Sequence, residues 1–173
     1  PTGRVYGRAE LEALGALAIR HDLVIVSDEI HCDLLHGGRQ HIPMASVSPE
    51  IAARTVTINS ATKSFNIPGL RCGVMHFGSP VLKARFEARL PRKLLGQPSI
   101  LGIDATVTAW DECQPWLDEV LVGLQARSDQ LAATLRRDLP QARFHQPEAT
   151  YLAWIDLSAL RLGMPAAQFF LEQ

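Results

Sequence analysis

Residues 60–73 read SATKSFNIPGLRCG and form a polar segment between two candidate strands. Thr55 to Asn59 come just before it and alternate threonine with aliphatic residues, as a strand does. Residues 72–77 follow and read as another strand. Because Pro68-Gly69 is typical of a loop, we expect residues 60–71 to form a loop at the end of a strand.

Upstream, a short apolar run ends in acidic residues. Leu23 to Val26 are continuously apolar, which suits a strand covered on both faces. Ser27-Asp28-Glu29 follows this run, and residues 8–21 before it place leucines at helical spacing. Ligand sites in open α/β sheets form at the carboxyl ends of strands. We therefore expect Asp28 to lie beside the 60–71 loop.

The side chains at these two places have a shared chemistry. Ser60, Thr62 and Arg71 supply two hydroxyls and a guanidinium, which suit a phosphate. Lys63 supplies an amine that can form a Schiff base with a carbonyl. Asp28 supplies a negative charge, which suits a protonated ring nitrogen. Pyridoxal 5′-phosphate (PLP) has all three features, and the sequence has no GxGxxG or Walker loop for a nucleotide.

Helices dominate the rest of the chain. Apolar spacing and proline positions predict helices over residues 80–90, 98–110, 115–140 and 165–173, and a strand over 151–155. This order predicts an α/β sheet layer, a long helix and the start of another domain. We expect the C-terminal part of a large domain over 1–114, a connecting helix over 115–140 and an incomplete small domain over 141–173.

Composition argues against several classes of protein. The 173 residues are 47% hydrophobic and 20% charged with a net charge of −1, without the clustered positive charge of a nucleic-acid binder. The sequence contains no run of ~18 apolar residues, which is the length that a membrane-spanning helix needs. Cys32, Cys72 and Cys113 form no CxxC pair, which favours a reducing cytoplasm over a disulfide scaffold or a metal site. Because the chain begins at Pro1 and ends at Gln173 within an expected helix, we expect a fragment of a longer protein.

Several stretches carry a resemblance to a known family. Pro1-Thr2-Gly3, residues 27–31 (SDEIH) and residues 60–73, in this order, resemble the class I/II aminotransferase superfamily of fold-type I PLP enzymes. Residues 27–34 (SDEIHCDL), His41-Ile42-Pro43 and residues 147–154 (PEATYLAW) are similar to its cystathionine β-lyase, or C–S lyase, branch of the MalY/PatB kind. The resemblance implies part of a three-layer α/β/α PLP-dependent transferase-like large domain. The start of a smaller α+β C-terminal domain should follow.

The resemblance also implies roles for single residues. Lys63 matches the lysine that bonds the cofactor, and Asp28 matches the aspartate that faces the pyridine nitrogen. Ser60 and Arg71 match phosphate ligands, and His31 stands where many aminotransferases have a tyrosine that contacts the ring hydroxyl. The family's ring-stacking aromatic residue, its asparagine before Pro-Thr-Gly and its carboxylate-binding arginine lie outside this sequence. We therefore expect the fragment alone to bind PLP poorly.

For the intact protein we expect a PLP-dependent carbon–sulfur β-lyase. It would convert cystathionine or related cysteine S-conjugates into a thiol, pyruvate and ammonia. The resemblance implies a homodimer with a small amino-acid substrate. An aminotransferase uses the same anchoring residues and stays open as an alternative, as does a catalytically inactive fragment or regulatory module.

Each site residue also has a structural interpretation. Asp28 could cap the following turn, Arg71 could form an ion pair, and Ser60 could shape a turn through backbone hydrogen bonds. Thr62 could point away from the ligand. His31 could be a structural histidine. These alternatives differ in which atoms each side chain contacts.

Overall fold

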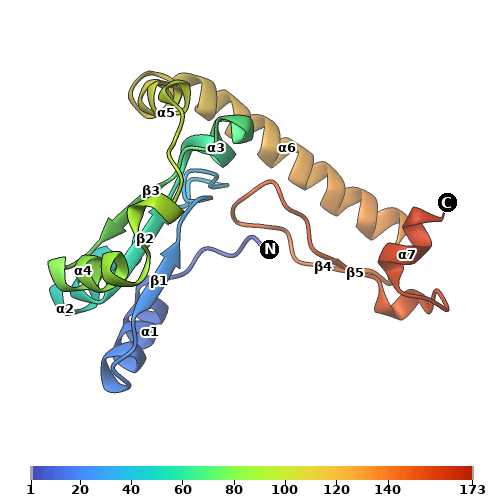
Figure 1. Cartoon of the computed structure of the whole chain (residues 1–173). Coiled ribbons are helices and arrows are strands. Elements are labelled where there is room, and N and C mark those ends of the chain that lie inside the picture. Colours follow the sequence, from blue (N-terminus) through green and yellow to red (C-terminus); the bar gives the residue numbers. More distant parts are fainter. Residues whose placement is uncertain (1, 173) are drawn as a thin grey trace.

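The computed structural model describes residues 2–172 and contains a small mixed sheet with helices around it (Figure 1). Strands β1 (Ile25–Asp28) and β2 (Thr55–Asn59) are parallel, with Ile25 opposite Thr55 and Asp28 opposite Ile58. Strand β3 (Val74–Phe77) pairs antiparallel with β2. The predicted strand at 55–59 is confirmed, whereas β1 begins at Ile25 rather than Leu23 and β3 at Val74 rather than Cys72.

Helices lie on both sides of this sheet, and those on one side pack closely against it. Helix α1 (Arg8–Arg20), the 3₁₀ turn η1 (Met44–Ser46) and helix α2 (Pro49–Ala53) bury Leu11, Met44 and Ile51 against Ile25 of β1. Successive strand residues point to opposite faces. Accordingly, Val26 lines a cavity on the other face, together with Phe86 of helix α4 (Pro80–Arg89). The helix predicted over residues 8–21 is confirmed.

The segment between β2 and β3 was expected to be a loop, and this is wrong in part. It contains helix α3 (Ala61–Ser64) and the 3₁₀ turn η2 (Pro68–Leu70). Ser60 caps α3 by accepting a hydrogen bond from the backbone N–H of Thr62. Ala61 and Phe65 are buried on the inner side of α3, so packing stabilises a helix that is too short to persist by itself.

Longer helices follow the sheet, as predicted. After η3 (Arg92–Leu94), helix α5 (Ile100–Glu112) begins behind its cap Ser99, so Pro98 precedes the helix instead of opening it. Helix α6 (Gln114–Asp138) has Pro115 in its first turn and runs across the molecule (Figure 1). Ala109 of α5 and Leu117 of α6 complete the core around Ala61 and Phe65.

The C-terminal segment is only partly as expected. Strands β4 (Arg143–Phe144) and β5 (Ile155–Asp156) form an antiparallel pair, followed by η4 (Ser158–Leu160) and α7 (Ala166–Leu171). The predicted strand 151–155 is therefore wrong except at Ile155. A left-handed Thr150, with φ of 71°, turns the chain just before that stretch. The division into domains stays a prediction.

Residues 147–150 return to the N-terminal end of the chain (Figure 1). The backbone N–H groups of Glu148 and Ala149 both donate to the carbonyl of Gly3, at 2.8 and 2.9 Å. Gly3 has φ of 68°, and a Cβ there would lie 2.4 Å from Cβ of Pro147. This close approach explains the glycine of the Pro-Thr-Gly stretch, whose Pro1 lies outside the described residues. No helix among residues 2–172 is long and apolar enough to cross a membrane.

Candidate functional site

Lys63 stands on α3, at the carboxyl end of the parallel pair. Its side chain is exposed and makes no hydrogen bond or ion pair with another described residue. The next residue, Ser64, is buried and its Oγ donates to Oδ2 of Asp33 at 3.0 Å. This bond fastens the short helix to the turn that follows β1. A fixed helix with a free amine at its surface suits a covalent anchor.

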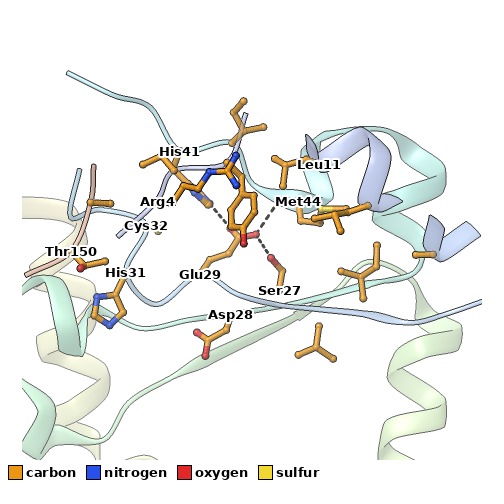
Figure 2. A pocket seen from close by; sticks show the side chains of 18 of the residues that line it. Arg4, Leu11, Ser27, Asp28, Glu29, His31, Cys32, His41, Met44 and Thr150 are labelled. Atoms are coloured by element: carbon orange, nitrogen blue, oxygen red, sulfur yellow. Dashed lines mark hydrogen bonds and ion pairs between the residues drawn. The ribbon is translucent and has the colours of Figure 1, made fainter. Parts of the chain in front are cut away.

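Asp28 and His31 lie at the end of β1 and in the turn after it. The Asp28 carboxylate accepts only a long bond, 3.3 Å, from the backbone N–H of Ile30, and is otherwise exposed. Figure 2 shows the Asp28 and His31 side chains on the same side of this segment. The imidazole is half-buried, and its Nδ1 is buried with no hydrogen-bond partner among the described residues.

His31 also connects Asp28 with Lys63 electrostatically. Burial lowers the pKa of His31, the nearby Lys63 charge lowers it further, and Asp28 acts in the opposite direction. A lowered pKa favours the neutral imidazole, which has one donor and one acceptor nitrogen. The ring therefore keeps a hydrogen-bonding nitrogen, the unpartnered Nδ1, within the electrostatic influence of both the Asp28 carboxylate and the Lys63 amine.

The predicted phosphate ligands are held close to one another. Ser60 is buried, and its Oγ contacts Oγ1 of Thr62 at 2.9 Å and the carbonyl of Cys72. The contact with Cys72 joins the start of α3 to the segment carrying Arg71. Arg71 has a left-handed backbone (φ 49°), and its residue is exposed. The turn-forming bonds considered for Ser60 are thus present.

Within the described part of the chain, Asp28 and Lys63 line two different cavities. Asp28 and His31 line a cavity of about 530 Å³ between the N-terminal segment, α1 and β1 (Figure 2). Thr62 and Lys63 line a separate one of about 330 Å³ beside α6. Neither cavity has Ser60 or Arg71 in its lining. The ring of Tyr151, which lines the second cavity, contacts the ring of His31, which lines the first.

Sequence reasoning missed the role of Glu29. Figure 2 shows its buried carboxylate on the opposite side from Asp28, accepting hydrogen bonds from Ser27 Oγ (2.8 Å), the Met44 backbone N–H (3.0 Å) and His41 Nε2 (2.8 Å). Burial alone would raise the pKa of Glu29, but the bonds from His41, Met44 and Ser27 together hold it below its ordinary value. The sequence signal that could have indicated a buried Glu29 was strand alternation, because neighbouring residues of a strand point to opposite faces.

These residues fit PLP by their donor chemistry. Lys63 offers an unpaired amine for an aldehyde, Asp28 a carboxylate for a protonated ring nitrogen, and His31 a buried ring nitrogen for a hydroxyl. Arg71 adds an exposed guanidinium for phosphate. The described residues hold no group of three or more His, Cys, Asp or Glu side chains arranged for a metal ion.

Comparison with known proteins agrees with this chemistry. The family model for aminotransferases class I and II matches residues 1–172. Cystathionine beta-lyase PatB of Bacillus subtilis (strain 168) is 36% identical over 94% of this chain and 42% of its own length. Protein MalY of Escherichia coli (strain K12) is 34% identical over 97% and 43%. An aspartate aminotransferase of Geobacillus stearothermophilus is 33% identical over 73% and 32%.

Solved structures that resemble this chain include a PLP-bound C–S lyase. A structure titled OvoB has a TM-score of 0.93 and 45% identity, over 99% of this chain and 45% of the other. The PLP-bound C–S lyase from Staphylococcus hominis has a TM-score of 0.90 and 35% identity, over 99% and 44%. The chain thus spans less than half the length of these relatives, and the predicted fold class, part of an α/β/α large domain, is confirmed. The chain belongs to the aminotransferase class I and II family.

Proposed function

We propose that the whole protein to which these residues belong is a PLP-dependent carbon–sulfur β-lyase. Its substrates would be cystathionine or related cysteine S-conjugates, and its products a thiol, pyruvate and ammonia. The observation that carries this proposal is the similarity to a curated cystathionine β-lyase along 94% of the chain, with Lys63 and Asp28 within the matched family region.

Lys63 would bond the cofactor aldehyde and later move the substrate's Cα proton. Bound PLP would supply an electron sink for the electrons left at Cα. When it is not bonded to the cofactor, the amine of Lys63 would be free to act as a general base for the Cα proton. Its helix is tied down by the Ser64–Asp33 bond, so the amine would stay close to the reacting carbon.

The other residues would bind and orient. Asp28 would keep a proton on the cofactor's ring nitrogen, because a fixed carboxylate raises the pKa of a neighbouring base. His31 would hold the ring hydroxyl through its unpartnered Nδ1. Arg71, with Thr62 and Ser60 at the start of α3, would hold the phosphate. The electrons left at Cα would then expel the sulfur from Cβ as the thiol, and water would hydrolyse the remaining enamine to pyruvate and ammonia.

We further propose a cytoplasmic homodimer. Leu94, Ile100 and Leu101 are 74, 76 and 72% exposed around the start of α5. A group of large apolar side chains in water is typical of an interaction surface. Light scattering on the full-length protein tests this: a monomer at micromolar concentration would contradict the homodimer.

An aminotransferase is the second candidate, favoured by the similarity to the Geobacillus aspartate aminotransferase. One assay separates the reactions. The full-length protein is incubated with cystathionine, with and without a keto-acid acceptor, and pyruvate and thiol are measured. A β-lyase releases both without an acceptor, whereas an aminotransferase requires the acceptor and leaves the carbon–sulfur bond intact. No reaction under either condition would support the inactive module.

A further inference from the structure

The segment before Tyr151 is anchored on both sides. Glu148 and Ala149 donate their backbone N–H groups to Gly3, and the N–H of Thr150 donates to the carbonyl of Leu34 at 2.7 Å. The Thr150 carbonyl in turn lies 2.7 Å from Nε2 of the buried His36. These bonds fix residues 148–150 against the turn that follows β1.

Thr150 has a conformation that costs energy. Its φ of 71° is left-handed, which a β-branched residue rarely adopts. Its Oγ1 accepts a hydrogen bond from the N–H of Leu152 at 3.0 Å, which closes a tight turn around Tyr151. Such conformations persist only where the surroundings determine them, and they are frequent at functional sites.

The turn places Tyr151 against the candidate site. Its ring centroid lies 5.3 Å from that of His31, with the planes tilted by 55°. Tyr151 also lines the cavity that contains Lys63 and Thr62, while Thr150 lines the larger one that contains Asp28 and His31. Thr150-Tyr151 therefore lies between the two cavities over which the site residues are divided (Figure 2 shows Thr150 beside His31).

We infer that Tyr151 is a positioning residue for His31. Its ring holds the imidazole in place near the charges of Asp28 and Lys63 and shields one face of it from water, and the left-handed backbone of Thr150 directs the Tyr151 ring toward His31. The inference rests on the proposed function, since it assigns Tyr151 to the same PLP site. It requires the aromatic ring and not the hydroxyl, which makes no hydrogen bond to another described residue.

The test uses full-length holoenzyme with Tyr151→Ala, Tyr151→Phe and, as a matched control, Trp154→Ala in the same segment, where Trp154 is 61% exposed. We measure the pKa of His31 by NMR, PLP dissociation and kcat/KM. Burial lowers the pKa of His31, so Tyr151→Ala should raise it. PLP should bind about three- to tenfold more weakly, the range expected for one aromatic contact. Tyr151→Phe and Trp154→Ala should match the wild type.

The inference is overturned if Tyr151→Ala leaves the pKa of His31 and PLP binding unchanged, or if Tyr151→Phe is equally damaging. Thermal melting shows whether each variant is folded; a folded Tyr151→Ala protein with an unchanged pKa contradicts the inference outright. If the proposed function is wrong, the result is a different one, because the wild type itself would then contain no lysine-linked PLP. If the wild type forms a reducible lysine adduct but Tyr151→Ala has the same His31 pKa and PLP binding as the wild type, the inference is wrong and the proposed function stands.

Discussion

Two adjacent carboxylates at the end of β1 have opposite environments. Asp28 is exposed toward the cavity, whereas Glu29 is 7% exposed and accepts three hydrogen bonds from the chain itself. Alternation along an extended backbone produces this division. Asp28 therefore has its charge available for a ligand, while Glu29 fastens the 41–44 segment to the strand that carries Asp28.

Replacing Glu29 with glutamine should destabilise the fold at neutral pH. The amide oxygen can keep the bonds from Ser27 and Met44, but the N–H₂ group replaces the charged oxygen that pairs with His41, and loss of this part-buried charged hydrogen bond costs about 1–3 kcal/mol. Because the pKa of Glu29 is lower in the folded state than in the unfolded chain, its contribution is complete above the unfolded pKa. It is lost as pH falls below ~4.3 and through the folded pKa.

Urea unfolding of wild type and Glu29→Gln between pH 3 and 8 measures this effect. The difference in stability should be largest at neutral pH and shrink in acid. The control is Glu12→Gln, which removes an exposed 4.0 Å pair with Arg8 and should change little. Equal stability of Glu29→Gln and wild type at pH 7 would contradict the role given to Glu29.

At the scale of elements, two helical glycines have opposite surroundings. A Cβ on Gly15 of α1 would lie 2.1 Å from Cδ1 and 2.7 Å from Cγ1 of Ile51, whereas one on Gly123 of α6 would meet nothing within 4 Å. Gly15 thus permits the contact of α1 with α2 beneath β1. Gly123 is exposed and only weakens its helix.

Gly15→Ala and Gly123→Ala should therefore shift stability in opposite directions. Crowding at Gly15 costs about 1–3 kcal/mol, which outweighs the gain of up to ~1 kcal/mol in helix propensity. Gly123→Ala should gain about 0.5–1 kcal/mol because only the propensity changes. Chemical denaturation of both variants measures this, and a stabilised Gly15→Ala would disprove the close packing of α1 on α2.

The alternation of polar and apolar residues predicted a strand best where it ran without interruption. Thr55 to Asn59 alternate without interruption, and β2 has those bounds. The apolar run at Leu23 misplaced β1, because its extent depends on pairing with Thr55 to Ile58. The α3 helix escaped prediction because its stability comes from burial of Ala61 and Phe65.

Part of the candidate site could likewise be predicted. Lys63, Asp28 and Arg71 could be proposed from the sequence because each belongs to a motif that is continuous in sequence, and their roles stay predictions. The contact of Tyr151 with His31 and the bond of Glu29 with His41 join residues far apart along the chain. Spacing alone contains no information on such contacts.

At the scale of the whole molecule, large apolar side chains of the sheet and of α5 are exposed. Val26 of β1 is 64% exposed, although strands of parallel sheets are normally covered on both faces. Ile100 and Leu101 of α5 are exposed to a similar degree. PatB and MalY are more than twice as long as this chain, and we propose that residues outside these 173, or a second copy in the homodimer, cover these surfaces in the whole protein.

The 173-residue chain expressed alone should accordingly bind PLP weakly and show little turnover. Its exposed apolar surface should bind a hydrophobic dye more strongly than the full-length protein does. PLP titration and a pyruvate assay on both proteins, at equal concentration, measure the difference. Full-length activity from the isolated chain would show that its own residues suffice for the site.

The proposed function depends on a covalent bond between PLP and the amine of Lys63. The most direct measurement is borohydride reduction of the full-length holoprotein, followed by peptide mapping of the adduct, for wild type and Lys63→Ala. We predict a visible absorption band that reduction abolishes, one modified peptide containing Lys63, and no adduct in the variant. An adduct on another lysine in the wild type, or an unchanged adduct in Lys63→Ala, would contradict the account.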